Sequence, residues 1–145
     1  VIISEGIESE RKYPLWDRYT IGGYIYEFPA GLVESNEEFH EGAVREMYEE
    51  TGLKFTPLKV DPAFEKPYFT TVGMTDESCA TVYGYAEGEI SKDAQEDTEE
   101  IEVVLADREE VKRILREENV AIMCAYQLMH FLRDEEPFAF LKEKL

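Results

Sequence analysis

Four charged residues stand close together in the middle of the chain, namely Arg45, Glu46, Glu49 and Glu50. On a helix each residue advances by about 100°, which puts the three glutamates within about 140° of the arginine on one side. Like charges on one helix face repel each other. A hard divalent cation such as Mg²⁺ or Mn²⁺ reverses this effect because it prefers oxygen ligands. Spacing alone therefore leaves two readings open, a metal site and a solvated acidic face.

The elements that must position these residues follow from periodicity and from turn signals. We expect a helix over about Glu37 to Thr51, ended by Gly52, and a second helix that starts after the N-cap Asp107 and continues through Leu115. A third, apolar helix is expected over Ala121 to Leu132. Strand candidates, rich in β-branched and aromatic residues, are Val1 to Ile3, Tyr24 to Phe28, Lys54 to Val60, Tyr68 to Val72, Ser78 to Ala86 and Ile101 to Leu105.

This order of elements predicts one domain over residues 1–145 of the α+β class, with a mixed sheet between helices in an α/β/α sandwich. The chain opens at Val1 in a β-branched run, so we expect residues upstream of it. The acidic run from Asp93 to Glu100 is expected to form a loop.

The formal net charge of −18 argues against binding of nucleic acid, which needs a basic patch. It leaves room for a small phosphorylated substrate, because divalent cations bridge carboxylates to phosphates. No apolar run is long enough to span a membrane, and the first residues do not resemble a signal peptide. Cys79 and Cys124 form no CxxC pair, which argues against a disulfide scaffold or a zinc site. We therefore expect a cytoplasmic protein.

The full spacing of the charged segment resembles the signature of the Nudix hydrolase family. Its fixed positions are Gly31, Glu37, Arg45, Glu46, Glu49, Glu50 and Gly52. The resemblance implies a loop–helix–loop that holds catalytic metal against a diphosphate. It implies Mg²⁺ (Mn²⁺ possible) on Glu46, Glu49 and Glu50, with the carbonyl of Ala30 as a further ligand. It also implies an internal ion pair between Glu37 and Arg45, and glycines at positions 31 and 52 where the backbone turns sharply.

Two flanking segments resemble a subgroup of that family, the ADP-ribose and nucleotide-sugar pyrophosphatases. Glu27 to Gly31 is similar to the lead-in Glu-x-Pro-Ala-Gly, and Thr71 to Glu77 is similar to the loop Ser-Pro-Gly-x-Ser/Thr-Asp/Asn-Glu, with Val72 in place of its proline. The resemblance implies substrate contacts by Glu27, Gly73 and Glu77, a further metal ligand at Glu99, and a general base at Asp97 or Glu96. It also implies a homodimer. For Glu27, an ordinary carboxylate at the end of a strand would look the same. A solvated turn remains the alternative for the acidic loop.

Residue chemistry adds Arg11 and Arg18 as candidate phosphate contacts, since a guanidinium matches phosphate oxygens, although solvent-exposed loop arginines would look the same. The aromatic residues Trp16, Tyr19, Tyr24 and Tyr26 either stack on adenine or pack in the core or a dimer interface. His40 and His130 are expected to be structural.

The function expected from the resemblance is Mg²⁺-dependent hydrolysis of the diphosphate of ADP-ribose or a related nucleoside-diphosphate sugar. A dinucleoside polyphosphate hydrolase, suggested by Tyr68, is the nearest alternative. A nucleoside triphosphatase is disfavoured by the lead-in. A non-catalytic nucleotide sensor is disfavoured because all the carboxylates of the signature are present.

Overall fold

The computed structural model describes residues 2–7, 24–95 and 100–143. In this part of the chain the strands are β1 (Ile2–Ile7), β2 (Ile25–Glu27), β3 (Lys54–Pro57), β4 (Tyr68–Phe69), β5 (Ser78–Cys79), β6 (Gly84–Glu87) and β7 (Glu100–Leu105). The α-helices are α1 (Phe39–Thr51), α2 (Arg108–Glu117) and α3 (Ile122–Arg133). Two short 3₁₀ helices are η1 (Pro62–Phe64) and η2 (Ala139–Lys142).

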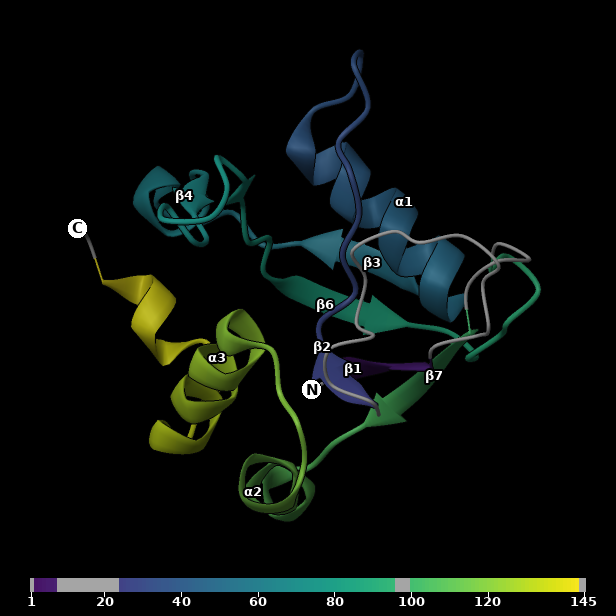
Figure 1. Ribbon diagram of the computed structural model, residues 1–145, viewed down its shortest axis with the longest axis vertical. Coiled ribbons are helices and arrows are strands. Elements are labelled where there is room, and N and C mark those ends of the chain that lie inside the picture. Colours follow the sequence, from purple (N-terminus) through teal and green to yellow (C-terminus); the bar gives the residue numbers. More distant parts are fainter. Residues whose placement is uncertain (1, 8–23, 96–99, 144–145) are drawn as a thin grey trace.

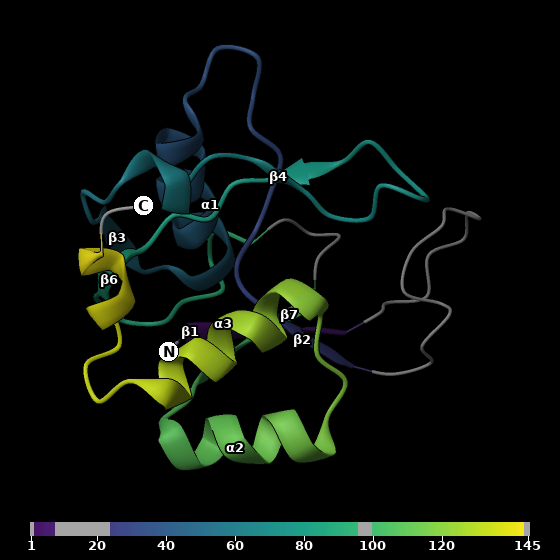
Figure 2. The same ribbon diagram turned by 90° about the vertical axis from the view of Figure 1, so that its left-hand side faces the viewer.

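The strands form small antiparallel sheets in the order β2-β1-β7, β3-β6 and β4-β5. In the first sheet Ser4 pairs with both Glu27 and Val103, which sets its register. In the second, Lys54 pairs with Glu87. A parallel bridge between Tyr26 and Val120 continues the first sheet towards the start of α3. Helix α1 lies on one side of the β2-β1-β7 and β3-β6 sheets and the α2–α3 pair on the other (Figures 1 and 2). The α+β fold class with strands between helices is therefore confirmed.

The main core lies where α2 and α3 pack against β2. Its buried members are Tyr26, Ala106, Val111, Ile114, Cys124 and Leu128. Burial of large apolar side chains is the dominant favourable contribution to folding. This assigns Tyr26 to the core, whereas Tyr24 is 47% exposed. Trp16 and Tyr19 lie outside the described residues.

The three predicted helices are present, and their ends follow the expected signals. Gly52 has φ +75°, a left-handed conformation that favours glycine, and its N–H donates to the carbonyl of Tyr48 at 2.8 Å. The side chain of Asp107 accepts hydrogen bonds from the N–H groups of Glu109 and Glu110 at 3.0 and 2.9 Å, as an N-cap should. Across the described ranges no helix has the length and apolar character needed to cross a bilayer.

One predicted strand is wrong. The segment Ser78 to Ala86 is divided between β5, which pairs with β4, and β6, which pairs with β3. The chain changes partner between them, and the carbonyl of Tyr83 accepts a hydrogen bond from the N–H of Leu58 at 2.7 Å just before β6 begins. Alternating polarity along the segment does not reveal such a change, because pairing is decided by residues distant in sequence.

Candidate active site

The loop before α1 is closed by its own carboxylates. The N–H of Glu37 donates to the carbonyl of Glu34 at 3.1 Å, and the N–H of Glu34 donates to Oε2 of Glu37 at the same distance. At the helix start, the N–H of Glu38 donates to Oε2 of Glu41 at 3.1 Å. A carboxylate in the first turn is favourable because it faces the positive end of the helix dipole. These bonds fix how the loop enters α1.

The side chain of Arg45 joins that loop to the helix. Its Nε donates to Oε1 of Glu37 and its Nη2 to Oε2 of Glu37, both at 3.0 Å, and Nη2 also reaches the carbonyl of Leu32 at 3.1 Å. This two-point pairing matches the planar guanidinium to the carboxylate. It lowers the pKa of Glu37 through the hydrogen bonds from Arg45, and it raises the pKa of Arg45.

The same guanidinium also holds two carboxylates of the helix. Nη1 of Arg45 donates to Oε1 of Glu46 at 2.7 Å and to Oε2 of Glu49 at 2.8 Å. Two carboxylate oxygens therefore lie within hydrogen-bonding reach of one nitrogen. The positive charge offsets the repulsion that neighbouring glutamates on one helix face exert on each other.

Glu46 and Glu50 face the segment at Ala30 and Gly31, which follows β2. A Cβ on Gly31 would lie 1.9 Å from Cδ of Glu46, so only glycine leaves room for this carboxylate. Gly31 does not have a positive φ, unlike Gly52, and the close approach of Glu46 gives a reason for glycine at this position. Glu50 is only 6% exposed, and its Oε1 accepts a hydrogen bond from the N–H of Ala30 at 3.3 Å.

These donors fit a hard divalent cation by type, since they are carboxylate oxygens and one of them is buried. In the described part of the chain no group of three acidic, histidine or cysteine side chains is arranged to hold a metal ion. Arg45 bonds to Glu46 and Glu49, while Glu50 bonds to the N–H of Ala30.

The end of α1 is held by a segment far along the chain. The N–H of Ser91 donates to the carbonyl of Thr51 at 3.0 Å. The side-chain amide of Gln95 donates to the carbonyl of Glu50 at 2.7 Å and to the carbonyl of Ile101 at 3.2 Å. Gln95 is not among the residues predicted for the site, since its only signal in the sequence is that it is an amide in an acidic run.

The expected substrate loop lies in the hairpin between β4 and β5, which Figure 2 shows extending away from α1. Glu77 is exposed, and its Oε2 accepts a hydrogen bond from Oγ1 of Thr70 at 2.8 Å. No heavy atom lies within 4 Å of a Cβ built on Gly73.

Glu27 ends β2 and is half-buried. Arg11, Arg18, Asp97 and Glu99 fall outside the described residues, as does Glu96.

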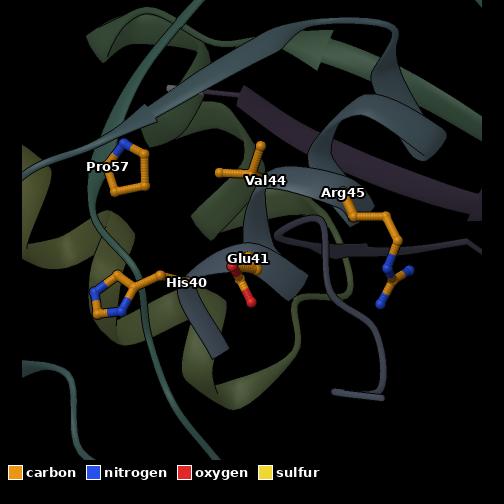
Figure 3. A pocket seen from close by; sticks show the side chains of 5 residues that line it. All are labelled: His40, Glu41, Val44, Arg45 and Pro57. Atoms are coloured by element: carbon orange, nitrogen blue, oxygen red, sulfur yellow. The ribbon is translucent and has the colours of Figure 1, made fainter. Parts of the chain in front are cut away.

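A pocket of about 360 Å³ runs along α1 beside Arg45 and is lined by His40, Glu41, Val44, Arg45 and Pro57 (Figure 3). Nε2 of His40 lies 3.1 Å from Oε2 of Glu65, a carboxylate that is 6% exposed. His40 thus ties α1 to the end of η1, a partner that no spacing in the sequence indicated. The hydroxyl of Tyr68 donates to the carbonyl of Ala63 at 2.9 Å.

Comparison with known proteins bears on the same segment. The model of the NUDIX domain family matches residues 8–126, which is most of the chain. A protein of Caenorhabditis elegans described as "Putative nudix hydrolase 2" is 30% identical over 96 residues, covering 63% of this chain and 42% of the relative. The chain thus matches less than half the length of this relative. Enzymes of the family generally use divalent metal ions and act on small nucleotide-derived substrates. With the family model matched across the loop and helix that carry the carboxylates, the chain belongs to the Nudix family.

Proposed function

We propose that the chain, as a single Nudix domain, hydrolyses the diphosphate linkage of ADP-ribose or a related nucleoside-diphosphate sugar. The products are a nucleoside monophosphate and a sugar phosphate. The observation that carries this proposal is the group of three carboxylates on one face of α1, with Glu50 buried against Ala30 and Glu46 packed against Gly31. The lead-in from Glu27 to Gly31 favours a nucleoside-diphosphate sugar among the possible diphosphates.

Glu46, Glu49 and Glu50 are the residues that would hold the metal, together with the carbonyl of Ala30 and with Glu99. Mg²⁺ is the proposed ion, and Mn²⁺ would be accepted by the same oxygen donors. When bound, such an ion offsets the charge of the diphosphate and makes a water molecule more acidic.

The other side chains orient the carboxylates or accept a proton. Glu37 fixes the guanidinium of Arg45 at two points, and Arg45 in turn orients Glu46 and Glu49. A carboxylate oxygen accepts the proton of the attacking water, and Asp97 is the proposed acceptor.

Substrate contacts are proposed for Glu27, Gly73 and Glu77, with Arg11 and Arg18 on the phosphates. We also propose that the chain forms a homodimer and acts in the cytoplasm.

The test is hydrolysis of a small panel with Mg²⁺ and with EDTA: ADP-ribose, UDP-glucose, a diadenosine polyphosphate and a nucleoside triphosphate. We expect metal-dependent release of AMP and ribose 5-phosphate from ADP-ribose. Preferential cleavage of another member would retain the reaction and reassign the substrate.

The matched variants are Glu50→Gln and Glu117→Gln. A glutamine at position 50 keeps the size of the side chain and can still accept from the N–H of Ala30, so the fold should persist. Because charge stabilisation in the transition state is lost, kcat should fall by about 10²-fold or more. Glu117 is exposed on α2, and its variant should retain activity. Normal turnover and normal Mg²⁺ dependence of Glu50→Gln would contradict the metal assignment.

A further inference from the structure

We propose that Gln95 is a positioning residue that holds the last turn of α1 in the geometry required for metal binding. This inference rests on the proposed function, because it takes Glu50 as a metal ligand. The amide nitrogen Nε2 of Gln95 donates to the carbonyl of Glu50 at 2.7 Å and to the carbonyl of Ile101 at 3.2 Å. Both amide hydrogens are therefore used, and one side chain joins the end of α1 to the start of β7.

The last turn of α1 needs this support. It carries Glu49 and Glu50 and contains no basic residue. Carboxylates at the carboxyl end of a helix face the negative end of its dipole, which disfavours them there. The last carbonyls of a helix also lack partners within the helix, so this turn tends to fray unless other groups bind them.

Among the residues that the structure describes, three groups bind carbonyls of this turn. The N–H of Gly52 reaches the carbonyl of Tyr48, and the N–H of Ser91 reaches that of Thr51. Gln95 supplies the donor for one of the two carbonyls between them, that of Glu50. It is the only one of the three that is a side chain, so it can be replaced without changing the backbone.

Glu50 is thereby held at two places. Its main-chain carbonyl accepts from Gln95, and its carboxylate accepts from the N–H of Ala30. The other contact of Gln95, Ile101, is buried and lies in the β2-β1-β7 sheet. Gln95 therefore attaches the last turn of α1 to a buried residue of this sheet. Groups that orient metal ligands in this way commonly change metal affinity when they are removed.

The test compares Gln95→Leu with Gln127→Leu. These are the two glutamines of the chain, so the substitution is chemically identical. Nε2 of Gln127 donates to the hydroxyl of Tyr83 at 2.9 Å, between α3 and the segment before β6. The probe is Mn²⁺ alone, titrated into the substrate-free protein and followed by the electron paramagnetic resonance signal of the free ion.

We expect Gln95→Leu to weaken Mn²⁺ binding by about tenfold or more, and Gln127→Leu to change it by less than about twofold. We also expect Gln95→Leu to lower kcat, and excess Mn²⁺ should restore part of the lost activity. A general loss of stability would not give this recovery. Where Gln95→Leu does not fold, Gln95→Asn carries the test. Its amide is one carbon shorter and cannot reach both carbonyls, so it should weaken Mn²⁺ binding by about threefold or more.

The variant Glu50→Gln distinguishes a failure of the proposed role of Gln95 from a failure of the proposed metal site. If it abolishes Mn²⁺ binding while Gln95→Leu binds Mn²⁺ like the unmodified chain, the role of Gln95 is overturned and the proposed function stands. If Glu50→Gln itself binds Mn²⁺ normally, the metal assignment is overturned, and the role of Gln95 with it.

Discussion

The carboxylate of Glu46 occupies the space that a side chain at position 31 would take. A Cβ built on Gly31 lies 1.9 Å from Cδ and 1.9 Å from Oε1 of Glu46, far inside van der Waals contact. The same Oε1 accepts the hydrogen bond from Nη1 of Arg45. Gly31 therefore acts on the site through Glu46, by leaving room for the position in which Arg45 holds it.

Replacing Gly31 by alanine should displace this carboxylate while leaving the fold intact. The atoms of Glu46 that lie near Gly31 are the carboxylate at the far end of a flexible side chain, so this carboxylate can move aside without shifting the backbone. We expect kcat of Gly31→Ala to fall by about tenfold or more, as for other changes to groups that orient metal ligands, with little change in the melting temperature. The control is Ser35→Ala, an exposed position in the same loop. Unchanged kcat in Gly31→Ala would show that the placement of Glu46 does not matter.

The pairing of Glu37 with Arg45 predicts a pH-dependent contribution to stability. Because hydrogen bonds from Arg45 lower the pKa of Glu37 below 4.5, the folded state binds this proton less readily than the unfolded state. The contribution is therefore present above that pH and is lost as the pH falls through the lowered pKa. Urea unfolding of Glu37→Gln and the unmodified chain should differ most near neutral pH and converge in acid.

The matched control for this experiment is Glu110→Gln in α2. Hydrogen bonds from Arg113 likewise lower the pKa of Glu110, so its variant should show the same direction of pH dependence. Only Glu37→Gln should also reduce hydrolysis, since Arg45 would lose its two-point anchor. Equal activities of the two variants would contradict a role of Glu37 at the site.

The two thiols should differ sharply in reactivity. Cys124 is 1% exposed, and burial, with the charge of Glu27 nearby, raises its pKa to about 12. Cys79 is exposed, although partial burial and the charge of Glu77 raise its pKa. Because the thiolate is the reactive form, a disulfide reagent at pH 8 should modify one thiol of the folded chain and both after unfolding in guanidinium. Reaction of both at similar rates in the folded chain would contradict the packing of α3.

The packing of α3 is tested more directly by truncating its buried side. Leu128 of α3 is fully buried in the core that also contains Val111 and Ile114 of α2, whereas its neighbour Met129 is 53% exposed. Leu128→Ala should lower the free energy of unfolding by about 2–5 kcal/mol, because it leaves a cavity. Met129→Ala, an exposed position, should stay within about 0.5 kcal/mol of the unmodified chain. Chemical denaturation of both variants measures the difference.

The helices could be predicted closely because their signals are local. Asp107 caps α2 and Gly52 ends α1, and both act on residues within one turn of themselves. The partners of Arg45 also lie within one helix and the loop before it, so the spacing of the signature places them together.

Contacts between segments that are distant in the chain have no comparable signal in the sequence. The division of Ser78 to Ala86 between two sheets depends on β3 and β4, which lie earlier in the chain. His40 meets Glu65 across 25 positions, and Gln95 meets Glu50 across 45. Nothing in the residue types at either end distinguishes these pairs from other polar residues at the surface.

The distance of 45 residues between Gln95 and Glu50 also orders events during synthesis. While the ribosome makes the chain from its amino end, α1 emerges well before Ser91 and Gln95 do. Until then the carbonyls of Glu50 and Thr51 lack these two donors, although the N–H of Gly52 can already reach the carbonyl of Tyr48. The final turn of α1 is completed only when the chain has reached β7, so the carboxylate face of α1 takes its final shape late.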